Sequence, residues 1–133
     1  MIGLDSNVLV RYIMQDDAGQ AARATRPMES LSVQAPGFVS LVAVVELVWV
    51  LSSCYELERD QISQAIDVLL RANQLVVDQA ENVARAHGAY SSGTADFADC
   101  LIERTSSLAG CDRTMTFDLK AARTAGMTLI QIA

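Results

Sequence analysis

The sequence has few cysteines, one histidine and no long uninterrupted apolar run. Its three cysteines, Cys54, Cys100 and Cys111, are odd in number and lack C-x-x-C spacing, which argues against a disulfide framework and a thiolate zinc site. We expect free, mostly buried thiols. The longest apolar run, residues 41–51, is interrupted by Glu46 and is far shorter than the roughly 20 residues that a membrane span needs.

No charged leader or apolar segment precedes the first predicted strand at Met1, so we expect no secretion and a cytoplasmic location. The chain has 133 residues, 51% of them hydrophobic, and we expect one domain over residues 1–133. The net charge of −6 disfavours a nucleic-acid partner at first sight. Metal ions held by clustered acids would offset much of this negative charge, so the net charge does not exclude a nucleic-acid partner.

Short apolar strands alternate with helices along the whole chain. The helices include one over residues 7–14, one from Asp17 to about Leu31, a buried one starting after Ser40, and one capped by Asp60. Strands are expected within residues 1–4, 38–39, 74–77, 114–117 and 128–132. This alternation predicts an α/β fold, a three-layer α/β/α sandwich with a short parallel sheet of four to five strands.

Two acids follow predicted strands directly. Asp5 comes after residues 1–4, and Asp118 comes after residues 114–117. The carboxyl ends of strands are where ligands and catalytic groups gather in open α/β sheets. Each position also suits a residue at the start of a helix, and Asp118 has a purely structural explanation as a helix N-cap.

Glu46 is the only polar residue among eleven residues that are otherwise apolar. Burying an unpaired carboxylate costs several kcal/mol, so a buried Glu46 must be protonated, paired or bound to metal. The alternative is a glutamate on the helix surface whose charge reaches solvent.

Asp96 and Asp99 lie three residues apart on a predicted helix, so both point the same way. Capping and a favourable helix dipole explain the pair equally well. The combination with Asp5, Glu46 and Asp118 favours a shared site. Crowded carboxylates repel each other unless cations neutralise them, and oxygen ligands without His or Cys favour Mg²⁺ or Mn²⁺.

Four segments in order resemble the PIN-domain nucleases, and most closely the VapC-type toxins of bacterial toxin-antitoxin pairs. They are MIGLDSNVL at residues 1–9, VELVW at 45–49, ADFAD at 95–99 and TFDLK at 116–120. The residues that match the family's site are the acidic quartet Asp5, Glu46, Asp99 and Asp118, the additional acid Asp96, Ser6 where the family usually has Thr, and Thr116.

The resemblance implies a metal-dependent endoribonuclease that cleaves RNA by attack of a metal-activated water on phosphorus. Asp5, Asp99 and Asp118 would hold Mg²⁺ or Mn²⁺ directly, and the products would carry 5′-phosphate and 3′-hydroxyl ends. The resemblance also implies a homodimer and a cognate VapB-type antitoxin that blocks the acids, with the helices from Asp17 and Asp60 as candidate docking surfaces.

The remaining candidates are cationic or aromatic. Arg11, Lys120 and Arg123 are candidate contacts to RNA phosphates, although ordinary solvated charge also explains them. We expect Trp49 and Phe97 to lie in the core. Because His87 is the one histidine, cleavage by paired histidines is disfavoured.

Two other readings of the sequence stay open. One is a phosphohydrolase of another α/β class with Asp5 as nucleophile. One motif of this kind requires a second Asp at the position that Asn7 occupies. The other is a non-catalytic domain that binds RNA or a protein partner through the same acids.

Overall fold

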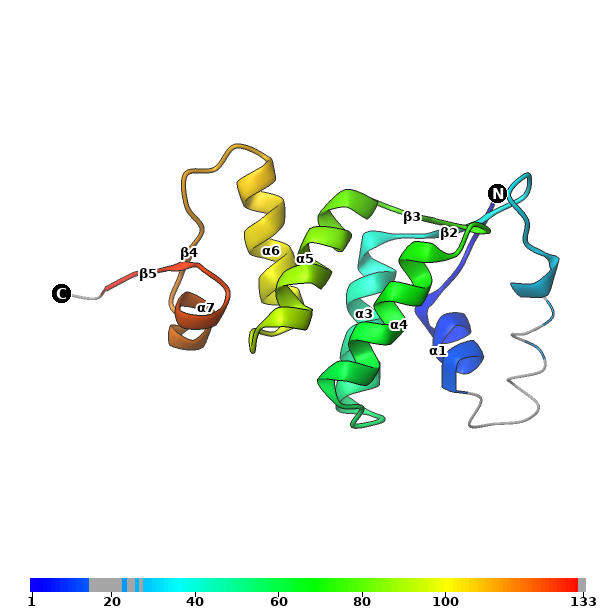
Figure 1. Cartoon of the computed structure of the whole chain (residues 1–133), viewed down its shortest axis with the longest axis horizontal. Coiled ribbons are helices and arrows are strands. Elements are labelled where there is room, and N and C mark those ends of the chain that lie inside the picture. Colours follow the sequence, from blue (N-terminus) through cyan, green and yellow to red (C-terminus); the bar gives the residue numbers. More distant parts are fainter. Residues whose placement is uncertain (15–22, 24–25, 27, 132–133) are drawn as a thin grey trace. The chain divides into compact units, whose positions relative to one another are not determined.

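A computed structural model describes residues 1–14, 23, 26 and 28–131 of the chain. These residues form two compact units, Met1–Ala80 and Glu81–Ala133, and each contains its own parallel sheet (Figure 1). Strands and helices alternate along the sequence, so the predicted α/β class is confirmed. That residues 1–133 act as one domain stays a prediction.

The first unit is built on a sheet of three parallel strands in the order β1-β2-β3, which are Ile2–Gly3, Gly37–Val39 and Leu75–Val77. Gly37 in the central strand is in register with Ile2 on one side and Leu75 on the other. The first strand ends beside β2, where the Leu4 amide donates to the Phe38 carbonyl at 2.9 Å. Asp5 therefore leaves the sheet at the carboxyl end of an edge strand.

Three helices of this unit have their bounds defined: α1 (Ser6–Met14), α3 (Leu41–Ser53) and α4 (Arg59–Arg71). Ser40 caps α3 as predicted, since its side chain accepts a hydrogen bond from the Ala43 amide at 3.2 Å. The predicted cap of α4 is wrong. Glu58 is the N-cap and forms a reciprocal capping box with Gln61, which places Asp60 in the first turn.

The core of the first unit lies between these helices. α1 packs against α3, and α3 lies beside α4 (Figure 1). The amphipathic pattern of α4 is confirmed, because Ile62, Ile66 and Leu69 are buried. Leu47 and Leu51 of α3 are fully buried, so α3 anchors the unit.

The second unit contains α5 (Ala80–Ser92), α6 (Phe97–Leu108), β4 (Met115–Thr116), α7 (Leu119–Thr124) and β5 (Thr128–Leu129). The strands β4 and β5 pair in parallel, and α7 connects them. Phe97 is buried as predicted, and its ring meets that of Tyr90 edge-on at 5.8 Å between centroids.

Several predictions about burial are wrong. Trp49 was expected in the core but is 61% exposed, because it lies on the side of α3 opposite Leu47 and Leu51. The cysteines are free as predicted, yet only Cys100 is buried, while Cys54 and Cys111 are exposed.

The predicted helix from Asp17 to about Leu31 lies largely outside the described residues, although residues 28–30 are helical. In the part of the chain that is described, no helix has the length and apolar character to cross a membrane.

Candidate functional site

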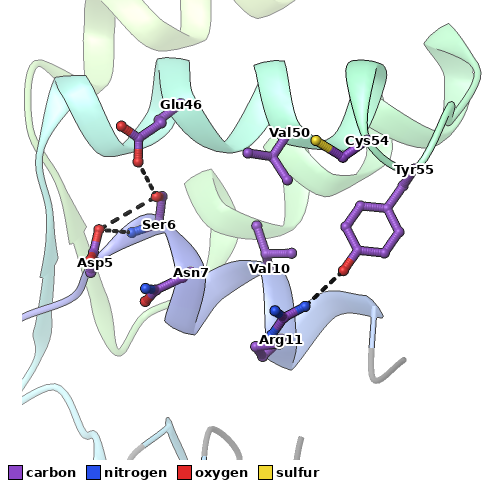
Figure 2. Close-up of a pocket in the computed structure, with 9 residues that line it drawn as sticks. All are labelled: Asp5, Ser6, Asn7, Val10, Arg11, Glu46, Val50, Cys54 and Tyr55. Carbon is purple, nitrogen blue, oxygen red and sulfur yellow. Dashed lines mark hydrogen bonds between the residues drawn. The ribbon is translucent and has the colours of Figure 1, made fainter. Parts of the chain in front are cut away.

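Ser6 links two carboxylates of the first unit, those of Asp5 and Glu46. Asp5 Oδ1 accepts a hydrogen bond from the Ser6 amide at 2.7 Å, at the point where β1 gives way to α1. The Ser6 hydroxyl donates to the carboxylate of Glu46 on α3 (Figure 2). Ser6 is buried and only 5% exposed, whereas Asp5 is exposed. A buried serine thus holds two carboxylates whose oxygens reach solvent.

Glu46 is not buried, which corrects the expectation drawn from its apolar neighbours. The helix α3 is apolar on all sides, but only the side that carries Val44, Leu47 and Leu51 faces the core. Glu46 follows Val42 by four residues and precedes Trp49 by three, so all three side chains lie on the exposed side of α3. The assignment of Glu46 to the candidate site therefore depends on its hydrogen bond with Ser6 and not on burial of its side chain.

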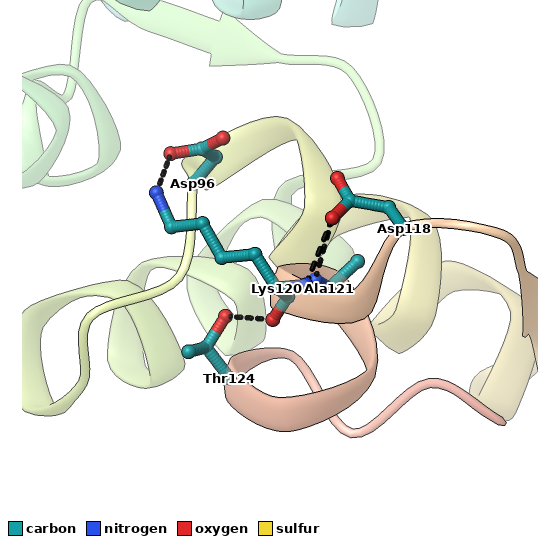
Figure 3. A network of polar contacts seen from close by, with 5 residues as sticks. All are labelled: Asp96, Asp118, Lys120, Ala121 and Thr124. Carbon is teal, nitrogen blue, oxygen red and sulfur yellow. Dashed lines mark hydrogen bonds and ion pairs between the residues drawn. The ribbon is translucent and has the colours of Figure 1, made fainter. Parts of the chain in front are cut away.

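Three acids of the second unit lie around the start of two helices. Asp96 is the N-cap of α6, yet its side chain makes no capping hydrogen bond. It pairs instead with Lys120 of α7, with 3.2 Å between Oδ1 and Nζ (Figure 3). The capping explanation for the Asp96 carboxylate is thus removed, although the residue does begin the helix.

Asp118 caps α7 as predicted. Its Oδ1 accepts hydrogen bonds from the amides of Lys120 at 2.8 Å and Ala121 at 3.4 Å (Figure 3). Thr116 also contributes, because its hydroxyl oxygen accepts from the Asp118 amide at 3.0 Å. These bonds fix the backbone and carboxylate of Asp118 between β4 and α7.

Asp99 lies in the first turn of α6, in the field of the other two acids of its unit. Partial burial raises the pKa of Asp99 above its ordinary value, and the negative charges of Asp96 and Asp118 raise it further. Lys120 opposes this effect and lowers the Asp99 pKa. The second unit therefore concentrates negative charge that one lysine offsets in part.

The five predicted acids form two groups, Asp5 with Glu46 in the first unit and Asp96, Asp99 and Asp118 in the second. Among the residues that the structure describes, no three His, Cys, Asp or Glu side chains are placed to hold a metal ion. The donors nevertheless fit a hard divalent cation, because all are carboxylate oxygens. Burial is the main cause of the raised Asp99 pKa, and the negative charges of Asp96 and Asp118, which a cation would relieve, add to it.

A pocket of about 560 Å³ extends from Asp5 and Glu46 along α1 and α3 to Arg11 and Tyr55. Arg11 Nη1 donates to the Tyr55 hydroxyl at 3.0 Å (Figure 2). Tyr55 was not among the predicted site residues, since no sequence motif relates two residues 44 positions apart. The other two candidate cations lie on α7, where Lys120 pairs with Asp96 and Arg123 is exposed.

Comparison with protein families gives a match to the PIN domain over residues 2–127, a span that contains all five acids. A search of curated proteins finds no match to the chain. PIN domains are generally nucleases, they act on nucleic acids, and they usually use divalent metals. The match covers almost the entire sequence, and we conclude that this chain belongs to the PIN domain family.

Proposed function

We propose that this protein is a metal-dependent endoribonuclease of the VapC toxin type, which cleaves RNA in the cytoplasm and is inhibited by a cognate VapB-type antitoxin. The observation that carries the proposal is the PIN domain match, which includes both groups of acids. The resemblance of four sequence segments to VapC-type toxins supports the finer assignment.

Both groups of acids serve the same reaction in this proposal. Asp5, Asp99 and Asp118 would hold Mg²⁺ or Mn²⁺, and Glu46 and Asp96, which are hydrogen-bonded to Ser6 and Lys120, would assist. When bound, the cation supplies positive charge that acidifies an attacking water and stabilises negative charge on the phosphate oxygens.

The protein's own bonds prepare these carboxylates before substrate arrives. The Ser6 hydroxyl donates to Glu46 and also lies 3.4 Å from Asp5 Oδ1, and the Ser6 amide donates to that same Asp5 oxygen, so Ser6 holds both carboxylates. Thr116 positions Asp118 in the same manner through the backbone amide. Such preorganisation matters because misplaced groups cost catalytic rate.

RNA binding is assigned to the cations near the acids. Arg11, Lys120 and Arg123 contact phosphates in this proposal, and Arg11 presents the planar fork of donors that suits phosphate oxygens. The substrate is single-stranded RNA or an RNA loop, since only unpaired bases expose edges that a protein can read.

A protein partner is supported by an apolar surface on α3. Val42 and Trp49 are 73% and 61% exposed and line a groove with Leu41 and Val45, directly beside Glu46. Exposed apolar patches of this kind are typical of interaction sites. We therefore propose that the antitoxin covers the acids from this side, and that the toxin is a homodimer.

The nuclease proposal is tested with purified protein, a fluorescent single-stranded RNA, and Mg²⁺ or Mn²⁺. We expect cleavage with 5′-phosphate ends, loss of cleavage on adding a chelator, and loss in Asp5→Asn and Asp99→Asn. Exposed acids outside the two groups supply matched controls, Asp60→Asn in the first unit and Asp112→Asn in the second, and both should retain activity.

Two results would contradict the assignment. Activity that survives in the Asp5→Asn, Asp99→Asn double variant would show that the site is wrong. Metal-dependent RNA binding without cleavage by the natural sequence would favour a non-catalytic binding domain.

A further inference from the structure

The pocket that begins at Asp5 extends well beyond the acids. In Figure 2, Asp5, Ser6 and Glu46 lie at one end, Val10 and Val50 face each other in the middle, and Arg11 and Tyr55 lie at the far end. All of these residues belong to the first unit. The proposed reaction uses the acidic end and the proposed phosphate contact of Arg11 uses the far end, which leaves the purpose of the apolar middle unexplained.

Arg11 is held in a defined position at that far end. It lies on α1, and its guanidinium donates to the hydroxyl of Tyr55, which follows the C-terminal end of α3 (Figure 2). Both residues are half-buried. A guanidinium fixed in this way loses less side-chain entropy when it binds a phosphate than a fully solvated arginine does.

The dimensions of the pocket fit one nucleotide. Arg11 of α1 lies six residues after Asp5, which immediately precedes this helix, and six helical residues span about 9 Å along a helix axis. The volume of about 560 Å³ admits a base and a sugar but not a duplex. Val10 and Val50 provide an apolar surface for a base, and the Tyr55 ring lies beside them.

We propose that this pocket binds the unpaired nucleotide next to the cleaved phosphodiester, with Arg11 on its phosphate and Tyr55 as the residue that positions Arg11. This subsite rests on the proposed nuclease function, because it binds the nucleotide beside the phosphodiester that the nuclease would cleave. A nucleotide matches both parts of the pocket, because its phosphate accepts hydrogen bonds from a guanidinium and its base packs on apolar side chains.

The test measures binding separately from cleavage. Fluorescence anisotropy follows a short single-stranded oligoribonucleotide in the Asp99→Asn background with Mn²⁺, and Arg11→Gln is compared with the unchanged arginine. We expect Kd to rise about tenfold and the slope of log K against log salt to fall by about 0.7, the contribution of one phosphate on a single strand. Arg71→Gln removes an exposed arginine of α4 and should change neither affinity nor slope beyond the control range.

A chemical scan then locates the contact. Oligonucleotides that carry one neutral methylphosphonate linkage are tested in turn against the natural sequence and against Arg11→Gln. We expect one linkage, adjacent to the cleaved one, at which neutralisation weakens binding to the natural sequence but not to Arg11→Gln. Equal losses in both proteins at every linkage would overturn the subsite.

Tyr55→Phe tests the positioning role, because it removes the hydroxyl and keeps the ring. We expect a threefold to tenfold rise in KM with little change in kcat, and a smaller effect when Arg11 is already Gln. Cleavage by the natural sequence with binding independent of Arg11 would overturn the subsite and leave the nuclease. Binding that depends on Arg11 without any cleavage would support the pocket and overturn the nuclease.

Discussion

The hydroxyl of Ser6 donates a hydrogen bond to the carboxylate of Glu46, 40 residues further along the chain. This bond joins the end of the first strand to the exposed side of α3. It makes Ser6, and not the apolar neighbours of Glu46, the feature that relates this glutamate to Asp5.

Replacing Ser6 by alanine should lower kcat for RNA cleavage by about 10-fold to 150-fold, since a hydrogen bond to a charged group contributes roughly 1.5 to 3 kcal/mol. Ser6→Thr keeps the hydroxyl and should retain most of the activity. Steady-state kinetics on one RNA substrate measure both variants. Equal activity in Ser6→Ala and the natural sequence would show that the bond to Glu46 does not orient the carboxylate for catalysis.

The stability of the metal-free protein should depend on pH through Asp99. Its pKa is raised in the folded state, so the stabilising contribution is complete below the unfolded pKa of about 4 and is lost as pH rises through the folded pKa. Asp99→Asn should lack this loss and should be more stable than the natural sequence at pH 7. Urea unfolding in chelator between acidic and neutral pH measures the difference, and Asp112→Asn is the control. A difference that does not change with pH would contradict the assigned cause.

Lys120 should set the acidic limb of the pH-rate profile. Lys120 lowers the Asp99 pKa, and Lys120→Met should therefore raise it and shift the rise of kcat/KM to higher pH. Lys120→Arg keeps the positive charge beside Asp96 and should shift the limb less. An unchanged limb in Lys120→Met would show that Asp99 does not titrate in the reaction.

Mn²⁺ should stabilise the folded protein through the proposed metal ligands. At 100 times its Kd, a ligand that binds only the folded state adds about 2.7 kcal/mol to stability, which appears as a rise in Tm. Asp5→Asn and Asp118→Asn should each lose most of this rise, whereas Asp60→Asn should keep it. Thermal unfolding with and without Mn²⁺ provides the measurement. A rise in Tm that persists in both Asp5→Asn and Asp118→Asn would contradict these residues as metal ligands.

A larger residue at Gly37 would crowd the side chains of two leucines. A Cβ at this position in the central strand would lie 2.8 Å from Leu4 Cδ1 and 2.9 Å from Leu31 Cδ1. Gly37→Ala should therefore destabilise the protein by about 1 to 3 kcal/mol, as overpacked core substitutions do. Gly88→Ala in α5 meets nothing within 4 Å and should stabilise the protein by up to about 1 kcal/mol through helix propensity. Urea unfolding of both variants tests the pair, and similar effects would contradict the packing argument.

The order of strands and helices follows from the sequence alone. Three kinds of local signal agree with the structure: apolar runs such as residues 38–39, capping residues such as Ser40, and the spacing of Ile62, Ile66 and Leu69. The same local logic placed Asp5 after β1 and Asp118 at the start of α7. Both results depend on neighbours within a few residues, which a sequence shows directly.

Tertiary structure decided which side of α3 is exposed and which distant residues meet. A helix that is apolar all round carries no periodic signal for its buried face, so the exposure of Glu46 and Trp49 did not follow from their sequence positions. The bonds of Ser6 to Glu46 and of Arg11 to Tyr55 join residues 40 and 44 positions apart. Such pairs form only because α1 packs on α3, and packing of two helices is a property of the folded chain.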